Sequence, residues 1–255
     1  MSHFPFKQEK YRQYRNTFLQ EVVVGFTFAH SLVPKDEMNA RFSDYVLRFF
    51  GVTNNGDLTT SSCNVSKKDL SQSFEFTDHS AFIHLNGQKY VCFSDTAIPQ
   101  VFKIRDFFNK VVEVKSINQT VLRKVNVFNI KAGEQAKVDA FKVRQSLFSE
   151  ALISALSDNG LDEKECEIPN FQKCEYQEDD VTVTIRTALL PPTSTQDKFH
   201  HLILDTLAVH KPIEGIKIEE ISDKLMDFNS IMYDCYHWCV SEQVKKVMLE
   251  SVENR

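Results

Sequence analysis

The sequence predicts an α+β fold: an N-terminal ferredoxin-like β-α-β-β-α-β unit at residues 1–133, packed on a C-terminal unit at 134–255. The second unit is expected to hold antiparallel strands, helices and a long C-terminal amphipathic helix. Three observations support this. Hydrophobic residues (42%) and charged residues (25%) have ordinary globular proportions in the 255-residue chain. Apolar runs of strand length alternate with runs at helical spacing. No low-complexity linker separates the halves, so we expect one compact body.

The elements of the first unit follow from local patterns. Val22, Val23 and Val24 open a β-branched run that predicts a buried strand. The dipeptide Asn86-Gly87 favours the positive φ angles of a type I′ turn and therefore predicts a hairpin. The predicted order is a strand at 21–30, a helix at 34–50, a loop at 53–73, a hairpin around Asn86-Gly87, a helix opening at Pro99 and a strand at 121–130.

The second unit is predicted in the same way. Apolar residues at helical spacing indicate a helix at 138–156, which Asn159-Gly160 would end. Two extended runs, 167–176 and 181–190, are joined by an acidic turn at 178–180. A strand at 200–210 and a long C-terminal helix complete the chain.

A strand followed by an amphipathic helix occurs twice, at residues 21–50 and 202–232. When His30 is aligned with His210, the apolar cores of the two strands coincide. The repeat is a signature of the architecture. The two histidines are expected at matching strand ends, where they are candidate rim residues.

Cys235, His237 and Cys239 resemble metal ligands, but their spacing favours another interpretation. The two cysteines continue a series of apolar residues separated by three or four positions, which predicts buried thiols on the seam of a helix. His237 would lie off that seam. The sequence also lacks a phosphate-binding glycine loop and a Gly-x-Ser-x-Gly or His-Glu-x-x-His motif. We therefore predict no metal, no cofactor and, on balance, no enzyme.

Basic residues are concentrated between Val101 and Arg144, where ten lysines or arginines accompany four acids, although the net charge of the chain is -5. In the strand at 121–130, alternation places Arg123 and Asn129 on one face, and Lys124 and Asn126 with Phe128 on the other. Basic side chains beside an aromatic residue are typical of nucleic-acid-binding sheets. The candidate binding residues are Lys103, Arg105, Lys110, Arg123, Lys124, Asn126 and Asn129.

Three segments carry a resemblance to a known family: residues 14–24, residues 123–130, and the region from Leu202 to Val244. In them the chain resembles a sporadically distributed family of uncharacterised bacterial proteins of about this length. The scattered distribution of that family implies a mobile gene. The resemblance therefore implies an accessory role in phage defence or in a toxin-antidote system.

These observations together predict a non-catalytic cytoplasmic interaction protein that acts through protein–protein contacts. The sequence shows no signal-peptide core and no run of 18 apolar residues, so we expect no membrane association and reduced thiols. A protein partner encoded nearby is expected, and a homo-oligomer stays open. One alternative is an RNA- or DNA-binding protein that uses the basic segment 101–144. A second is an enzyme with a dispersed site made of a histidine and a carboxylate.

Overall fold

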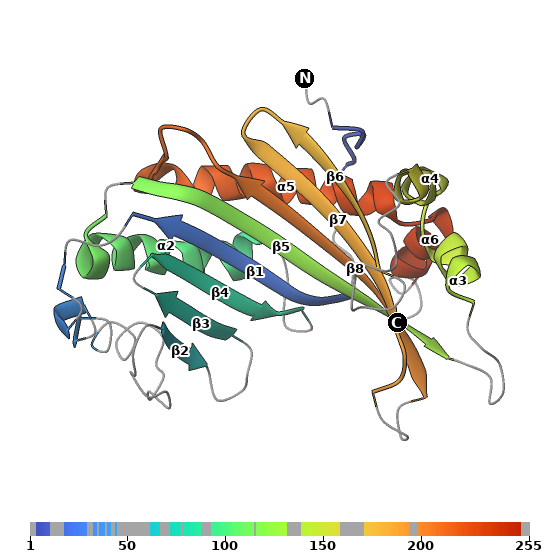
Figure 1. Cartoon of the computed structure of the whole chain (residues 1–255), viewed down its shortest axis with the longest axis horizontal. Coiled ribbons are helices and arrows are strands. Elements are labelled where there is room, and N and C mark those ends of the chain that lie inside the picture. The colour runs from blue at the N-terminus through green and yellow to red at the C-terminus, as the bar shows by residue number, and fades with distance from the viewer. Residues whose placement is uncertain are drawn as a thin grey trace. The chain divides into compact units, whose positions relative to one another are not determined.

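The structure is a computed structural model of the 255-residue chain (Figure 1). It describes residues 4–10, 18–29, 33–34, 36–38, 40–41, 44, 62–66, 72–77, 79–87, 93–114, 116–131, 139–158, 171–193 and 198–250. The chain divides into two compact units. Unit 1 consists of Met1–Gln20, Lys124–Ala208 and Ser230–Arg255, and unit 2 of Glu21–Arg123 and Val209–Asn229.

Unit 2 contains an antiparallel sheet in the order β2-β3-β4-β1-β5, with β9 paired to β5. Its helical segments include α2, which lies on one side of the strands in Figure 1. The strands are β1 (Leu19–Phe28), β2 (Ser62–Ser66), β3 (Gln72–Thr77), β4 (Ser80–Asn86), the first half of β5 (Ser116–Lys131) and β9 (Ile216–Lys217). The helical segments are a π-helical turn (Phe93–Ala97), α2 (Ile98–Phe107), a second π-helical turn (Phe108–Val112), a 3-10 turn (Ile218–Glu220) and the first half of α5 (Ile221–Cys239).

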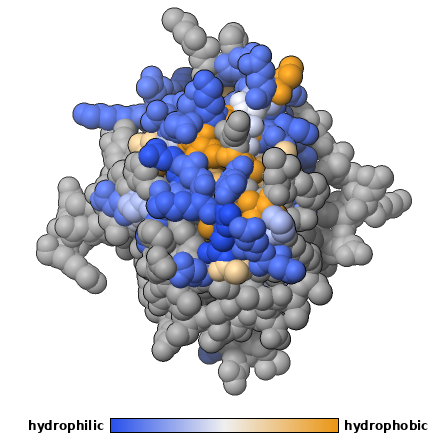
Figure 2. Space-filling view, turned by 90° about the vertical axis from the view of Figure 1, so that its left-hand side faces the viewer, coloured by the Kyte–Doolittle hydropathy of each residue, from blue (hydrophilic) through white to orange (hydrophobic). Residues whose placement is uncertain are grey.

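Aromatic side chains form the centre of unit 2. Phe108 is fully buried, and its ring packs edge-on against Phe26 at 5.7 Å and Phe28 at 5.2 Å between centroids. On the other face of β1, a Cβ atom at Gly25 would lie only 2.4 Å from the ring of Phe82, so this position requires glycine unless the ring shifts. The surface where α2 and the start of α5 lie carries small hydrophobic areas among hydrophilic side chains (Figure 2).

Unit 1 contains the strand order β5-β8-β7-β6, with helices from three parts of the chain. A tight turn at Asp179, whose φ is 50°, joins β6 to β7. The strands are the second half of β5, β6 (Gln172–Glu178), β7 (Val181–Leu190) and most of β8 (Phe199–His210). The helices are α3 (Ala140–Leu147), α4 (Glu150–Asp158), the second half of α5 and α6 (Glu242–Glu250).

The mixed α+β architecture with antiparallel strands and a C-terminal helix is confirmed, whereas the ferredoxin-like unit is not. The strand order differs, because the neighbouring strands of this sheet are β2-β3-β4-β1-β5, with β1 inserted between β4 and β5. Strand β2 lies where a loop was predicted. The hairpin turns between Thr77 and Ser80 instead of at Asn86-Gly87, and the hydroxyls of Thr77 and Ser80 bond to each other at 2.6 Å across the turn. Hydroxyl side chains therefore form a turn that the Asn-Gly rule does not detect.

The helix predicted at 138–156 is interrupted. Phe148 leaves the helical conformation and forms a β-bridge with Val240, so α3 ends at Leu147 and α4 starts at Glu150. The C-terminal helix is interrupted in the same way between Cys239 and Glu242. Helical periodicity continues through both breaks, which is why the sequence pattern does not reveal them.

Other predictions have clear outcomes. The thiols of Cys235 and Cys239 are fully buried on the α5 seam, as the spacing predicted. The predicted division at 133/134 falls outside the described residues, and so does His30. In the part of the chain that the structure describes, no helix is both long enough and apolar enough to span a membrane.

Candidate functional site

The α3–α4 junction and the α5–α6 junction of unit 1 are joined by reciprocal hydrogen bonds. The amide of Ser149 donates to the carbonyl of Cys239 at 2.8 Å, and the amide of Ser241 donates to the carbonyl of Leu147 at 2.9 Å. The hydroxyls repeat the exchange, because Ser149 Oγ donates to the Trp238 carbonyl at 2.6 Å and Ser241 Oγ donates to the Ser146 carbonyl at 3.1 Å. The two junctions are thereby fixed to each other.

Each of these serines also caps a helix. Ser149 Oγ accepts the amide of Leu152 at 3.2 Å at the start of α4, and Ser241 Oγ accepts the amide of Val244 at 3.4 Å at the start of α6. A glutamate follows each serine in the first turn, where it complements the positive end of the helix. The matching Phe148-Ser-Glu and Val240-Ser-Glu runs are therefore the local sequence basis of this arrangement.

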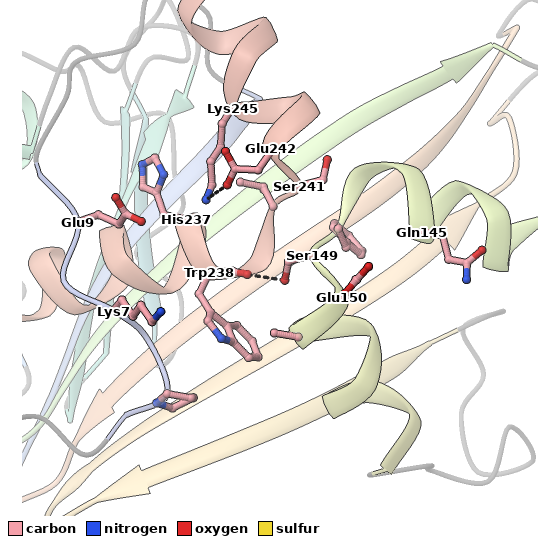
Figure 3. Close-up of a pocket in the computed structure, with 14 residues that line it drawn as sticks. Lys7, Glu9, Gln145, Ser149, Glu150, His237, Trp238, Ser241, Glu242 and Lys245 are labelled. Carbon is pink, nitrogen blue, oxygen red and sulfur yellow. Dashed lines mark hydrogen bonds and ion pairs between the residues drawn. The ribbon is translucent and has the colours of Figure 1, made fainter.

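A pocket of about 630 Å³ lies at these junctions, entirely within unit 1 (Figure 3). Three chain segments line it: the N-terminal segment 4–10, the α3–α4 junction and the α5–α6 junction. Its volume lies in the range of small-molecule sites. The lining residues are Pro5, Lys7, Glu9, Gln145, Phe148, Ser149, Glu150, Ala151, His237, Trp238, Val240, Ser241, Glu242 and Lys245.

The pocket combines both signs of charge with apolar side chains. Lys245 Nζ donates to a Glu242 carboxylate oxygen at 2.8 Å, and this hydrogen bond lowers the pKa of Glu242. Lys7 and Glu9 enter from the N-terminal segment, while Glu150 lies on the opposite wall (Figure 3). Such a lining offers donors and acceptors together, which suits a zwitterionic or peptide ligand better than a purely anionic one.

His237 is the buried titratable group of this pocket. Its side chain is 5% exposed and packs between two tyrosines, with ring centroids 4.5 Å from Tyr233 and 5.9 Å from Tyr236. The neighbouring serine hydroxyls donate to backbone carbonyls and accept helix amides. The described geometry therefore shows two capping serines near a histidine, and no hydrogen bond pairs either hydroxyl with the ring.

The N-terminal segment forms one wall of the pocket, and its side chains alternate between the protein core and the pocket. Phe4 and Phe6 are buried, whereas Pro5, Lys7 and Glu9 line the pocket. Phe6 packs edge-on against Trp238 at 5.4 Å and Tyr176 at 5.7 Å, and these two rings also pack against each other at 5.8 Å. This period-two alternation is that of an extended peptide.

Side-chain acceptors and donors of α5 hold the end of the same segment. The amide of Glu9 donates to Asp234 Oδ1 at 2.9 Å, and the Tyr233 hydroxyl donates to the Lys10 carbonyl at 3.3 Å. Burial raises the pKa of Asp234, while the bond from the Glu9 amide acts in the opposite direction.

The core of unit 1 also contains thiols, and a half-buried lysine lies at its edge. Lys124 shares the face of β5 that carries the buried Asn126 and Phe128, and desolvation of its ammonium group lowers its pKa to about 8. Burial raises the pKa of the Cys174 thiol to about 11 and that of Cys239 well above its usual value. These thiols are therefore neutral near pH 7 and do not supply a thiolate nucleophile.

The predicted binding residues are divided between the two units. In unit 2, Lys103 and Arg105 are half-buried on α2, and Lys110 pairs with Asp106 at 2.8 Å. The fourth residue there is Arg123, whose charge helps to lower the pKa of Glu21 after the larger effect of the hydrogen bond with His84.

The members of the predicted set that lie in unit 1 differ in exposure. Asn126 is buried, and Asn129 is exposed with its side-chain oxygen accepting a hydrogen bond from His201 Nδ1 at 2.9 Å. Phe128, the predicted stacking residue, is only 2% exposed because it packs between Phe18 and Phe148. It therefore presents no ring face to a base.

The candidate rim histidines do not line the pocket. His30 lies outside the described residues, and His210 is buried in unit 2 with its ring edge-on to Phe228 at 5.8 Å. The histidine that does line the pocket is His237, which the sequence placed off the apolar seam of α5. It lies in the last turn of α5, just before a helix break that local periodicity does not show.

Most of the pocket residues were not predicted, because their three segments are far apart in the sequence. The one local signal is the repeated Ser-Glu pair after an apolar residue, at Ser149 and Ser241. Both serines are helix caps, so this signal marks the junctions without identifying the ligand. No model of a known protein family matches this chain, and no curated protein matches it significantly.

Proposed function

We propose that this chain is a non-catalytic cytoplasmic protein that binds a segment of another protein in the pocket of unit 1. The observation that carries the proposal is the composition of the pocket wall. Lys7 and Lys245 lie with Glu9, Glu150 and Glu242 around apolar side chains. A peptide backbone presents donors and acceptors in alternation and carries side chains of either charge, so it can satisfy such a wall.

The geometry of the hydroxyl and thiol groups supports binding without catalysis. Ser149 and Ser241 use their hydroxyls to donate to carbonyls and to cap helices. A nucleophilic serine would instead need a base within hydrogen-bond distance to take its proton. The raised pKa values of Cys174 and Cys239 likewise leave these thiols protonated.

The biological context of the proposal comes from the sequence resemblance. A scattered, mobile family implies an accessory component of a phage-defence or toxin-antidote system, and its partner would be encoded beside it. Binding of a segment of that partner would fit such a role.

Nucleic-acid binding through the basic segment 101–144 stays a prediction with less support. Phe128 is buried, Lys110 is paired with Asp106, and the pKa of Lys124 is lowered by burial. A DNA or RNA affinity that falls steeply with salt would revive this alternative.

The proposal is tested by peptide selection on the purified full chain. A displayed random-peptide library is panned on the wild-type protein, and the selected peptides are measured against two charge reversals. Lys7→Glu changes the pocket wall, whereas Lys10→Glu changes an exposed lysine of the same segment that lies outside the lining. We expect Lys7→Glu to change the affinity by about tenfold, because a close charge is reversed, and Lys10→Glu to leave it unchanged.

Two outcomes would contradict the proposal. One is a library that yields no peptide with a measurable affinity for the wild-type chain. The other is an equal response to Lys7→Glu and Lys10→Glu, which would place the bound peptides elsewhere. Mass spectrometry of the peptides after incubation checks the non-catalytic part, since cleaved peptide would assign an enzyme.

A further inference from the structure

The N-terminal segment 4–10 is held to unit 1 as a ligand would be. It adds no strand to the sheet, because the structure assigns it no strand pairing. Phe4 and Phe6 anchor it with buried side chains, and hydrogen bonds at Glu9 and Lys10 fix its end to α5 side chains. By contrast, β1 makes a continuous register with β4 from Glu21 to Thr27. Because residues 4–10 have no strand pairing, the segment is expected to open at a lower cost than the sheet.

The site that receives Phe6 has the features of an aromatic anchor pocket. Tyr176 from β6 and Trp238 from α5 present their rings edge-on to Phe6 and to each other, so three aromatic rings form a closed cluster. Aromatic anchors in such clusters dominate the affinity of many peptide interfaces. Phe4 stacks on Phe6 at 5.5 Å with an interplanar angle of 12°, which extends the apolar contact by two residues.

The anchor site adjoins the pocket, and removal of the segment would join the two into one groove. Trp238 contacts Phe6 and also lines the pocket, and Pro5, Lys7 and Glu9 of the segment are the wall of that pocket. Displacement of the segment would therefore remove one wall and open the pocket toward Asp234 and Tyr233, whose hydrogen-bonding groups now bind the backbone of Glu9 and Lys10.

We propose that this groove of α5 and β6 is a peptide-binding surface whose resident occupant is the chain's own N-terminal segment, and that it accepts a partner's extended peptide with two aromatic side chains two residues apart. We infer the two aromatic side chains of the partner peptide from the resident segment, whose Phe4 and Phe6 occupy the buried positions. The inference rests on the proposed function and adds a second, competitive mode of binding at the anchor site, with its class of peptide and its competitor. The tethered segment has a high effective concentration, so a partner peptide enters the anchor site only by displacing it.

The test uses a labelled synthetic peptide with the sequence of residues 2–10, and a control peptide with alanine in place of both phenylalanines. The receptor is the full chain carrying Phe4→Ser and Phe6→Ser, which removes the anchors of the resident segment and leaves the groove intact. We expect this variant to bind the labelled peptide about tenfold or more tightly than the wild-type chain does, because tethered competition is lost. The control peptide should not bind.

Three results would overturn the inference. One is a folded variant, with wild-type near-ultraviolet circular dichroism, that does not bind the peptide. Another is equal binding of the two peptides. A third is a wild-type dimer that the added peptide dissociates, since this would assign the groove to a second copy of the chain.

Hydrogen exchange on the wild-type chain tests the same point without any substitution, and it decides the matter if the variant does not fold. The Glu9 amide should exchange about a hundredfold faster than amides of β7, because the segment opens without unfolding of the unit. Equal protection would show that the segment is an integral part of the fold. The two proposals can fail separately. If the groove inference fails, the proposed function still holds as long as the affinity of the peptides selected by library panning changes with Lys7→Glu.

Discussion

Units 1 and 2 bury different kinds of side chain, although both are built on antiparallel strands. The core of unit 2 is dominated by packed rings and aliphatic groups around Phe108. Among the described residues, unit 1 buries three thiols, His237 and six further polar side chains and half-buries Lys124, whereas unit 2 buries only Ser80, Thr120 and His210. A polar core costs desolvation unless its groups are bonded. Unit 2 is therefore expected to depend on packing, and unit 1 on pH and hydrogen bonding.

The largest expected effect is on packing in unit 2. Phe108→Ala removes a fully buried ring that contacts Phe26 and Phe28, and should lower the free energy of unfolding by about 4 kcal/mol. Urea denaturation followed by circular dichroism measures the loss. Phe141→Ala, at a side chain that is 57% exposed, is the control and should change the free energy by less than about 0.5 kcal/mol.

Trp238, the single tryptophan of the chain, makes the same experiment a test of the comparison. Its fluorescence reports on unit 1, whereas circular dichroism reports on the whole chain. A loss seen in circular dichroism with an unchanged fluorescence midpoint would show that the units unfold separately. An equal shift of the unfolding midpoint in both signals would contradict the distinction between the two units, because packing in unit 2 would then also stabilise unit 1.

Lys124→Met should give the next largest change in the free energy of unfolding, and it should raise this free energy where Phe108→Ala lowers it. The pKa of Lys124 is lowered to about 8 from its usual 10.5, so the folded state disfavours the charge. At pH 7 this costs about 3 kcal/mol, which methionine would recover while keeping the apolar stem. Chemical denaturation under reducing conditions should show the variant to be more stable than the wild type by that amount.

The pH dependence gives this prediction its sign. Between pH 8 and 10.5 the unfolded lysine holds a proton that the folded one has lost, so the lysine's contribution to stability rises with pH. The raised pKa values of Cys174 and Tyr176 act in the opposite direction at high pH, but they are common to both proteins. The advantage of the variant should therefore fall to about 1 kcal/mol at pH 10. A constant advantage would mean that better packing of methionine, and not the removal of the charge, explains the difference.

The buried cysteines of α5 and Lys124 on β5 show what local sequence patterns could predict. The spacing of Cys235 and Cys239 fixes the buried seam of α5 because one helix contains the whole pattern. Alternation likewise separates Lys124 from Arg123, but it does not say which face is buried, since that depends on the strands beside β5. The sequence therefore predicted the grouping of Lys124 with Asn126 and Phe128, and not its consequence.

The candidate site was less predictable for a related reason. Phe148 leaves a periodic helix at the point where Val240, 92 positions later, pairs with it. The pocket then forms where this junction meets the N-terminal segment. Local patterns in a single sequence do not report contacts between residues that are far apart in the chain. The sequence therefore could not predict that Ser149 and His237 lie in the same pocket.

The two capping serines should give intermediate and equal effects. Ser149→Ala and Ser241→Ala each remove one N-cap and one hydroxyl-to-carbonyl bond, and should each cost about 1 kcal/mol of unfolding free energy. Ser157→Ala is the matched control, since its hydroxyl bonds within α4 and alanine is the better helix former. Strongly unequal costs would show that the junctions are not equivalent, despite their reciprocal backbone bonds.

The smallest expected effect concerns Asp234, which receives the N-terminal segment. Burial raises its pKa, so the folded state binds a proton more tightly than the unfolded state does. This favours folding at low pH, and the benefit is lost as pH rises through the raised value. Asp234→Asn keeps an oxygen acceptor for the Glu9 amide and removes the charge, so it should stabilise the protein by about 0.3 kcal/mol at pH 7 after solvent screening, and not at pH 3. If the variant were instead destabilised at pH 7, the charge itself would be what holds Glu9. The N-terminal segment would then be an electrostatically bound part of unit 1, and the polar character of this unit would extend from its core to its surface.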